Sequence, residues 1–339
     1  MARGGVWEVG CGLRCARAAG GGAVVGGGGR RLCCGGVSGE RRDKVVVFGG
    51  WGFVGSRVRE MWSDALEVVA PTHAELDALD TDAVAALLSA ARPSVVLNLA
   101  AGAHVDAAEA ERGNRQGRVY ALNAAFPGRL ADLCRQRDAY LVHVSTDYVF
   151  DGTQTARAYR EDDPPHPLSW YGETKLAGEQ GVRDAHPGAC VARIEMPFSA
   201  RAHARTDFAR TCLARLAAGQ SIAGVTDQRI TPVFLDDAIG ALGRLIARRY
   251  AGLVHLASTT WTTPYAYARA VAERLGLHTE LVRPTTFDAF SATRPAPRPR
   301  CSWLDVTRFE TEFGPDILRP FEAELEAWVA QLSTAGSRA

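Results

Sequence analysis

One tyrosine and one lysine stand at a spacing that suits proton transfer. Tyr171 and Lys175 are four residues apart, so on a helix their side chains share a face. A free tyrosine has a pKa of about 10, and a neighbouring ammonium group lowers that pKa toward the range useful for acid–base catalysis. Only two of the 39 basic residues are lysines, which argues against the alternative of a solvated surface pair.

Three glycines form a turn of the kind that binds phosphate. Gly49, Gly52 and Gly55 lie between an apolar run and a helical stretch. The first glycine permits a tight turn, the second lets a pyrophosphate approach the backbone, and the third lets helix and strand pack closely. The helix N-terminus adds N–H donors and partial positive charge. We predict a dinucleotide cofactor here; the alternative is a packing turn without a ligand.

The end of the second expected strand bears on which dinucleotide binds. An acidic residue there would bind the ribose 2′-hydroxyl of NAD. The segment from Val69 to His73 has no acidic residue, which favours NADPH, but it also has no arginine for a 2′-phosphate. Glu75 and Asp77 come too late for the ribose and are expected near the adenine. The sequence therefore predicts NADPH and leaves NADH open.

Small and polar residues follow two further expected strands. Ala100 and Ala101 follow one of them, and Thr146 follows another, an apolar run ending at Val144. A hydroxyl at Thr146 can donate to a substrate carbonyl oxygen and polarise it. Because ligands of open α/β sheets bind outside the carboxyl ends of the strands, we expect these segments and the glycine turn to form one site.

Strands and helices alternate along the body of the chain. Continuous apolar runs typical of buried parallel strands alternate with amphipathic stretches typical of helices. We expect strands at 44–48, 67–70, 94–99, 140–144 and 190–194, and helices ending near 66 and spanning 81–91, 118–136 and 170–183. This alternation predicts an α/β fold of Rossmann type with a right-handed, doubly wound parallel sheet.

The pattern is less regular after residue 195, which predicts a smaller C-terminal α/β substrate-binding lobe. We expect helices at 206–218, 234–249, 264–275 and 320–332, and short strands near 221–225 and 253–257. Residues 284–299 are rich in proline and arginine and are expected to form an ordered loop over the site. The predicted domains are a leader over 1–43, a dinucleotide-binding domain over 44–195, a lobe over 196–332 that partly returns to the main sheet, and a tail over 333–339.

The leader differs in composition from the rest. It holds seven arginines against three acidic residues, and 14 of the 35 glycines precede residue 40. The leader shows neither the strand nor the helix period of apolar residues, so it cannot bury enough apolar surface to offset the chain entropy lost on folding. It lacks the serines of a transit peptide and the apolar stretch of a secretory signal. We expect a disordered extension or a misassigned start, with organelle import as the lesser alternative.

Composition also excludes several classes of protein. A net charge of +1 offers no electrostatic reason to bind nucleic acid or an anionic membrane. No apolar run approaches the ~20 residues of a membrane span. Cysteines 11, 15, 33 and 34 have no neighbouring histidine and fit no common zinc pattern, and the other four suit reduced thiols. We predict a cytoplasmic protein without a metal site.

Two longer motifs resemble a known enzyme family. They are HVSTDYVFDG over 143–152 and PLSWYGETKLAGE over 167–179. With them the chain resembles the extended short-chain dehydrogenase/reductases, and within these the dTDP-4-dehydrorhamnose reductase group, over about 44–332. The resemblance implies hydride transfer from NADPH or NADH to C4 of a 4-keto-6-deoxy sugar carried on a nucleoside diphosphate.

The resemblance also implies roles for individual residues. Tyr171 would protonate the new alkoxide, Lys175 would activate Tyr171 and bind the nicotinamide ribose, and Thr146 would be the third catalytic residue. Asp147 and Tyr148 would lie near the sugar. The cofactor would be bound by the three glycines of the turn and by further residues near it, which gives the set Gly49, Gly52, Phe53, Val54, Gly55, Asp77, Ala100 and Ala101.

One departure from the family concerns the substrate. The family often has Arg-Thr-Ser-Trp after the strand at 190–194, whereas Glu195 and Met196 occupy the last two positions here. We predict that both face the sugar, which leaves the exact sugar and the product stereochemistry open. Arg298 and Arg300 are predicted for the diphosphate because guanidinium groups suit phosphate oxygens. The alternative for both arginines is loop surface charge.

Other functions remain open from the sequence. A related branch contains the regulatory β-subunit of methionine adenosyltransferase, which binds NADP(H) and keeps the Tyr-x-x-x-Lys pair. Epimerases and dehydratases belong to the same superfamily, but dehydratases typically carry Asp-Glu after the catalytic threonine, where Asp147 and Tyr148 stand here. We predict a nucleotide-sugar substrate and no nucleic-acid or membrane partner, and we leave a homodimer open.

Overall fold

The computed structural model describes residues 43–336, with side chains to residue 334. Apart from Asp43, the predicted leader lies outside the described residues, and so do its four cysteines and the end of the predicted tail. The described residues belong to one compact unit. Among them, no helix is both long and apolar enough to cross a membrane.

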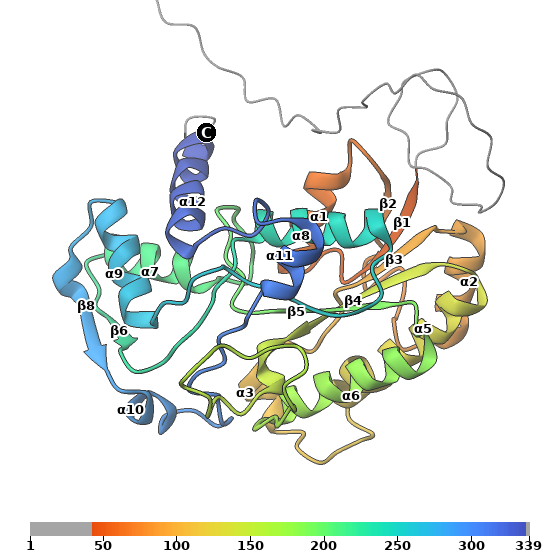
Figure 1. Cartoon of the computed structure of the whole chain (residues 1–339), viewed down its shortest axis with the longest axis horizontal. Helices are drawn as coiled ribbons and strands as arrows, with labels where there is room; N and C mark the ends of the chain where they lie inside the picture. Colours follow the sequence, from red (N-terminus) through yellow and green to blue (C-terminus); the bar gives the residue numbers. More distant parts are fainter. Residues whose placement is uncertain (1–42, 337–339) are drawn as a thin grey trace, which may run out of the picture. The chain divides into compact units, whose positions relative to one another are not determined.

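The described residues contain a central sheet of six parallel strands in the order β2-β1-β3-β4-β5-β7 (Figure 1). The strands are β1 Lys44–Phe48, β2 Glu67–Val69, β3 Val95–Asn98, β4 Tyr140–Thr146, β5 Cys190–Ile194 and β7 Gly252–Leu256. Val45, Val46 and Val47 are fully buried, as a central strand with helices on both faces requires. The predicted α/β class with a doubly wound parallel sheet is confirmed.

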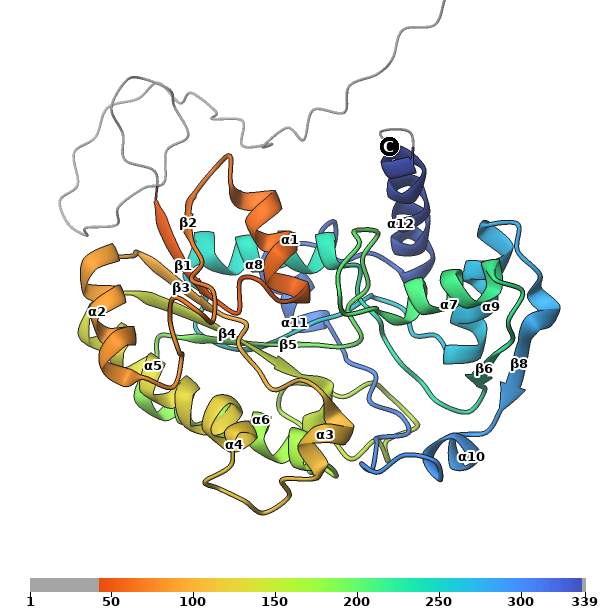
Figure 2. The same ribbon diagram turned by 180° about the vertical axis from the view of Figure 1, so that it is seen from behind.

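Helices cover both faces of this sheet (Figures 1 and 2). On one face, α1, α8 and α11 pack into an apolar cluster that includes Val58, Leu242 and Phe309. On the other, α2, α5 and α6 pack into a cluster that includes Leu88 and Leu130. The bounds are α1 Phe53–Trp62, α2 Thr81–Ala91, α5 Phe126–Gln136, α6 Trp170–Ala185, α8 Leu235–Arg248 and α11 Thr307–Phe313.

Strand β4 is longer than predicted. The expected strand ends at Val144, but in the structure Thr146 still pairs with Ile194 of β5. The polar residues Ser145 and Thr146 remain extended because the neighbouring strand supplies hydrogen-bond partners, which an apolar pattern does not reveal. Thr146 is therefore the last residue of the strand instead of lying just past it, and the 3₁₀ turn η2 Asp147–Val149 follows.

The helix expected over 118–136 contains a π-helical segment. It consists of α4 Arg118–Tyr120, η1 Ala121–Ala125 and α5. The π segment carries the buried Asn123, whose Oδ1 accepts from the backbone N–H of Gly102 (2.8 Å) and whose Nδ2 donates to Thr174 Oγ1 (3.1 Å). It thereby ties the loop after β3 to α6, in keeping with the frequent location of such segments at functional sites.

The chain after residue 195 contributes to two cores. Strands β6 Ile222–Val225 and β8 Val282–Thr285 pair in a small parallel sheet. Helices α7 Phe208–Ala217 and α9 Pro264–Arg274 share an apolar cluster with α12 Phe321–Gly336. In contrast, α8 and β7 pack with the main sheet.

The loop expected over 284–299 is only partly a loop. It contains the end of β8 and the short helix α10 Phe287–Ser291. Pro284 lies in β8, which has a neighbour on one side only, the kind of strand in which proline is tolerated. Three further short elements were not expected: α3 Val105–Glu109, η3 Thr279–Leu281 and α11. Each spans about two helical turns or fewer, too short for its apolar residues to show a helical period.

Candidate active site

A cavity of about 390 Å³ opens at the carboxyl ends of β1, β3, β4 and β5. It brings together the glycine turn, the loop after β3, the end of β4 and the start of α6. The first three of these segments are the ones that the sequence placed at one edge of the sheet, and the structure adds the start of α6. Its lining is Gly49, Gly52, Phe53, Val54, Gly55, Leu99, Ala101, Ala103, Val105, Val144, Ser145, Thr146, Asp147, Tyr148, Tyr171, Lys175, Ile194, Met196, Pro197, Arg205, Thr206, Asp207 and Phe208.

The glycine turn forms a cradle that side chains would fill. Gly49 has φ +74°, and a Cβ there would lie 2.7 Å from the backbone N of Ala100. The N–H of Gly52 donates to the carbonyl of Gly49 (3.0 Å) and begins α1. The first turn of α1 has no acidic residue, so its N–H groups face the cavity without a competing negative charge. The backbone at this turn fits a pyrophosphate.

Thr146 and Tyr171 meet on the cavity wall. Both side chains line the cavity, close enough for the Thr146 hydroxyl to act on the pKa of Tyr171, and Thr146 Oγ1 donates to Asp147 Oδ1 (3.0 Å). Burial raises the pKa of Tyr171 to about 12, while the Thr146 hydroxyl acts in the opposite direction. The net direction is upward because desolvation of the phenolate outweighs the other effects; the lowering of this pKa by Lys175 stays a prediction.

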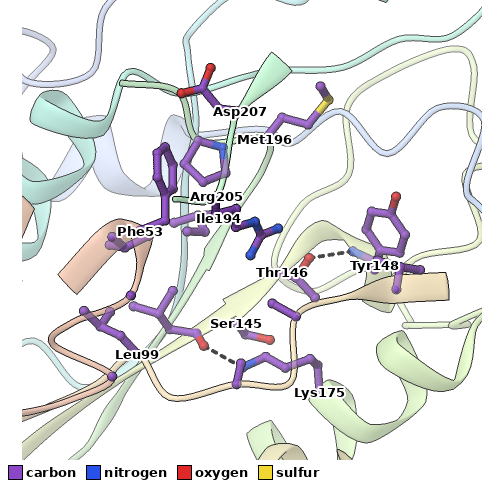
Figure 3. Close-up of a pocket in the computed structure, with 18 of the residues that line it drawn as sticks. Phe53, Leu99, Ser145, Thr146, Tyr148, Lys175, Ile194, Met196, Arg205 and Asp207 are labelled. Carbon is purple, nitrogen blue, oxygen red and sulfur yellow. Dashed lines mark hydrogen bonds between the residues drawn. The ribbon is translucent and has the colours of Figure 1, made fainter. Parts of the chain in front are cut away.

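Lys175 lies near Ser145 and Thr146, and its amino group is directed at the sheet (Figure 3). Its Nζ donates to the carbonyl of Val144 (2.7 Å) and lies 3.5 Å from His143 Nε2. Burial lowers the pKa of Lys175 to about 8, because an ammonium group loses hydration at this depth. The backbone bond fixes its position and leaves further N–H donors on the same group.

Asp147 and Glu195 form a buried carboxyl pair behind Thr146. Glu195 is 0% exposed, and its carboxyl group accepts from the Thr231 backbone N–H (2.8 Å) and the Ser302 hydroxyl (3.0 Å). Ser302 also acts on Asp147, in the direction that lowers the pKa of its carboxyl group. Desolvation and mutual repulsion raise the pKa of Glu195, and desolvation raises that of Asp147. Glu195, predicted to face the sugar, is absent from the cavity lining.

This pair predicts an unusual dependence of stability on pH. Because the pKa of Glu195 is raised, the folded state holds a proton that the unfolded state releases. The free energy of unfolding therefore falls as pH rises from about 4.3, the pKa of a free glutamate, toward the raised pKa of Glu195. Glu195→Gln keeps an acceptor for Thr231 but cannot ionise. We expect its free energy of unfolding in urea to change less between about pH 5 and about pH 9 than that of the native protein.

The matched control is Glu326→Gln, on the exposed surface of α12. It should keep the native pH dependence, because no buried charge is removed. If the free energy of unfolding changed with pH equally in Glu195→Gln and in the native protein, this would contradict a proton held at Glu195.

Other predicted cofactor and sugar residues divide into two groups. Phe53, Val54, Ala101, Tyr148 and Met196 line the cavity, and Met196 has the left-handed φ of +37°. The predicted cofactor residues Ala100 and Asp77 do not line the cavity. Ala100 is buried, and its N–H donates to Asn98 Oδ1; Asp77 accepts from the backbone N–H of Leu79.

The predicted diphosphate arginines are engaged elsewhere. Arg298 binds Asp106 (2.8 Å), and Arg300 binds Asp227 (2.7 Å) as well as Asp288. Neither arginine lines the cavity, whereas Arg205 does. The positive charge of Arg205 is close enough to act on Tyr171, in the direction that lowers its pKa. Arg205 is not among the residues predicted from the sequence; its one available signal is its place just before the helix expected at 206–218.

The parallel sheet, the glycine turn and the Tyr171–Lys175 spacing together define an extended short-chain dehydrogenase/reductase. A family model described as the RmlD substrate binding domain matches residues 43–334. The chain belongs to this family and is an oxidoreductase of the dTDP-4-dehydrorhamnose reductase type. The resemblance noted in the sequence is thus confirmed.

Relatives of known name agree with this membership. A dTDP-4-dehydrorhamnose reductase of Mycolicibacterium smegmatis is 37% identical over 290 residues, which are 85% of each chain. A probable low-salt glycan biosynthesis reductase, Agl14 of Haloferax volcanii, is 34% identical over 79% of this chain and 91% of its own. The fold matches a Bacillus anthracis dTDP-4-dehydrorhamnose reductase in complex with NADP (TM-score 0.79, 24% identity, 86% and 100% coverage).

Proposed function

We propose that this chain reduces the 4-keto group of a 6-deoxy sugar carried on a nucleoside diphosphate, with Tyr171 as the proton donor. The observation that carries this proposal is that Tyr171, Thr146 and Lys175 line the same cavity as the glycine turn. A donor pair beside a phosphate-binding turn suits delivery of a proton to an oxygen that gains an electron pair.

The cradle described above supports a nicotinamide dinucleotide at the glycine turn. When bound, this cofactor supplies the hydride. Gly49, Gly52 and Gly55 would hold the pyrophosphate by backbone N–H groups. Lys175 would bind ribose hydroxyls with the donors that Val144 does not use. The NADP bound to the Bacillus anthracis relative supports the same cofactor class here.

Thr146 and Tyr171 would act on the substrate oxygen. Thr146 would donate a hydrogen bond to the keto oxygen, exchanging its present bond to Asp147 for one to the substrate. Tyr171 would transfer its proton to the alkoxide as C4 becomes tetrahedral. Phe53, Ile194 and Pro197 present apolar surface around the reacting atoms and limit access of water.

A turnover assay tests this function. The purified full chain is mixed with NADPH and dTDP-4-dehydrorhamnose, and with 4-keto-6-deoxy sugars on UDP and GDP, while absorbance of the reduced cofactor is followed. We expect consumption with at least one of these sugars and a 4-hydroxy product by NMR. No consumption with any of them, together with co-purification of a methionine adenosyltransferase catalytic subunit, would favour the regulatory alternative.

Arg205 is the residue that we propose for the substrate diphosphate. It lines the cavity, and no carboxylate of the described residues forms an ion pair with its side chain. We expect Arg205→Ala to raise KM for the nucleotide sugar about 10- to 100-fold, the effect of losing hydrogen bonds to a charged group, with a smaller effect on kcat.

Arg300→Ala is the matched comparison for Arg205→Ala. Arg300 is bound to two acidic side chains, so its loss should change KM by less than about threefold. Steady-state kinetics with the nucleotide sugar as the varied substrate measures both variants. A large KM effect at Arg300 with none at Arg205 would instead support the assignment made from the sequence.

A further inference from the structure

The tip of β2 is joined to the glycine turn by Trp51. The indole Nε1 of Trp51 donates to the carbonyl of Ala70, the first residue after β2 (2.9 Å). The turn is pressed against the same residue, since a Cβ at Gly50 would lie 2.6 Å from Ala70 Cβ. The side chain of Trp51 is nevertheless 52% exposed. An aromatic ring is therefore held at the place where dinucleotide folds bind the adenosine ribose.

Arg59 of α1 reaches this ring. Its Cζ lies 3.4 Å from the centroid of the Trp51 ring, at stacking distance. Helical side chains lean toward the helix N-terminus, which brings a residue of the last turn of α1 back toward the glycine turn. The ring thus holds the guanidinium beside the end of β2, where the sequence from Val69 to His73 has no arginine or lysine.

Arg59 is also the arginine of this region that has no acidic partner. Arg57 binds Asp236 and Glu60, and Arg201 binds Glu60, whereas no described carboxylate pairs with Arg59. A stacked guanidinium keeps its planar edge available for an anion. Because its ring contact costs it no hydrogen-bond donors, Arg59 can offer a bidentate fork to phosphate oxygens.

The nearest acidic residue at the β2 tip is already engaged. Glu75 accepts from the backbone N–H (2.8 Å) and the hydroxyl (2.9 Å) of Thr72. These bonds hold its carboxylate in a local turn, whereas binding of a ribose 2′-hydroxyl would require an acidic group directed at the ribose. At the tip of β2, the guanidinium of Arg59 is therefore the charged group that remains available to a ligand.

We propose that Arg59, stacked on Trp51, binds the 2′-phosphate of the cofactor and makes this enzyme prefer NADP(H) to NAD(H). The proposal rests on the proposed function only in requiring a dinucleotide at the glycine turn. It assigns the cofactor preference to a residue of α1 rather than to the residues that follow β2 in the chain.

Calorimetry with two small probes tests the proposal without turnover. The full chain is titrated with 2′,5′-ADP, which carries the 2′-phosphate, and with 5′-AMP, which lacks it. We expect the native protein to bind 2′,5′-ADP about 10- to 100-fold more tightly, and Arg59→Gln to remove most of this difference while changing 5′-AMP binding less than about twofold. Trp51→Ala should reduce the preference in the same direction.

A charge-matched control is Arg135→Gln. Arg135 is exposed on α5 and pairs with Asp132, so its loss removes one positive charge at a distance from β2. It should keep the native preference. The melting temperature is measured without ligand for Arg59→Gln, Trp51→Ala and Arg135→Gln. A value equal to that of the native protein would show that the fold is intact.

Two outcomes would overturn the proposal: equal affinity of the native protein for both probes, or an equal loss for both probes in Arg59→Gln. Failure of sugar reduction alongside a strong, Arg59-dependent preference for 2′,5′-ADP would contradict the proposed function alone. In the active enzyme, the same variant should raise KM for NADPH and leave KM for NADH nearly unchanged.

Discussion

Tyr171→Phe will lower kcat about 10²- to 10⁴-fold, the range that a positioned acid–base group contributes. The phenol lines the cavity together with Thr146, and the centroid of its ring lies 5.7 Å from that of Tyr148 in an edge-on arrangement. Phenylalanine keeps that contact and removes only the hydroxyl. Binding of the cofactor, measured by calorimetry, should therefore change little.

Tyr250→Phe provides the control for this substitution. Tyr250 lies outside the cavity, where its ring packs against Phe313, so loss of its hydroxyl should leave kcat unchanged. Single-turnover kinetics separates the chemical step from product release. A native rate of the chemical step in Tyr171→Phe would show that another group supplies the proton.

Gly55→Ala should have the largest effect on the architecture of the site. A Cβ at Gly55 would lie 2.5 Å from Gly50 Cα and closer still to the carbonyl oxygen of Gly49. Both neighbours are backbone, so the turn itself must move. We expect a loss of about 1–3 kcal/mol in the free energy of unfolding, the usual cost of overpacking, and weaker dinucleotide binding.

The matched glycine is Gly240 in α8. It is exposed, and nothing lies within 4 Å of a Cβ added there. Gly240→Ala should stabilise the protein by up to about 1 kcal/mol, because alanine loses less backbone entropy in a helix. Urea unfolding with and without NADPH compares the two. A Gly55→Ala protein with native stability and native affinity would contradict the close packing of this turn.

Much of the fold could be predicted because the relevant signals are local. The runs of buried valines in β1 and the helical period over 81–91 appear in consecutive residues, and the structure places these elements at those positions. Elements with weak or mixed patterns were missed. The polar end of β4 is extended because β5 pairs with it, and β8 tolerates Pro284 because it lies at an edge.

The electrostatics of the site could not be predicted in the same way. Glu195 follows a strand and was expected to face the sugar, but Thr231 and Ser302, far away in the chain, enclose its carboxyl group. Arg298 binds Asp106, which is 192 residues distant. Burial also raises the pKa of Tyr171.

The sequence by itself determined the family, the class of fold and the spacing of the chemically competent residues. Helix and strand geometry place residues four apart on one face and bring strand ends to one edge, so these relations follow from the local chain. Only the tertiary structure decided which charges remain available to ligands. Arg205 and Arg59 remain without acidic partners among the described residues, whereas Arg298 and Arg300 are paired. Pairing and desolvation depend on contacts between distant segments, which no local pattern encodes.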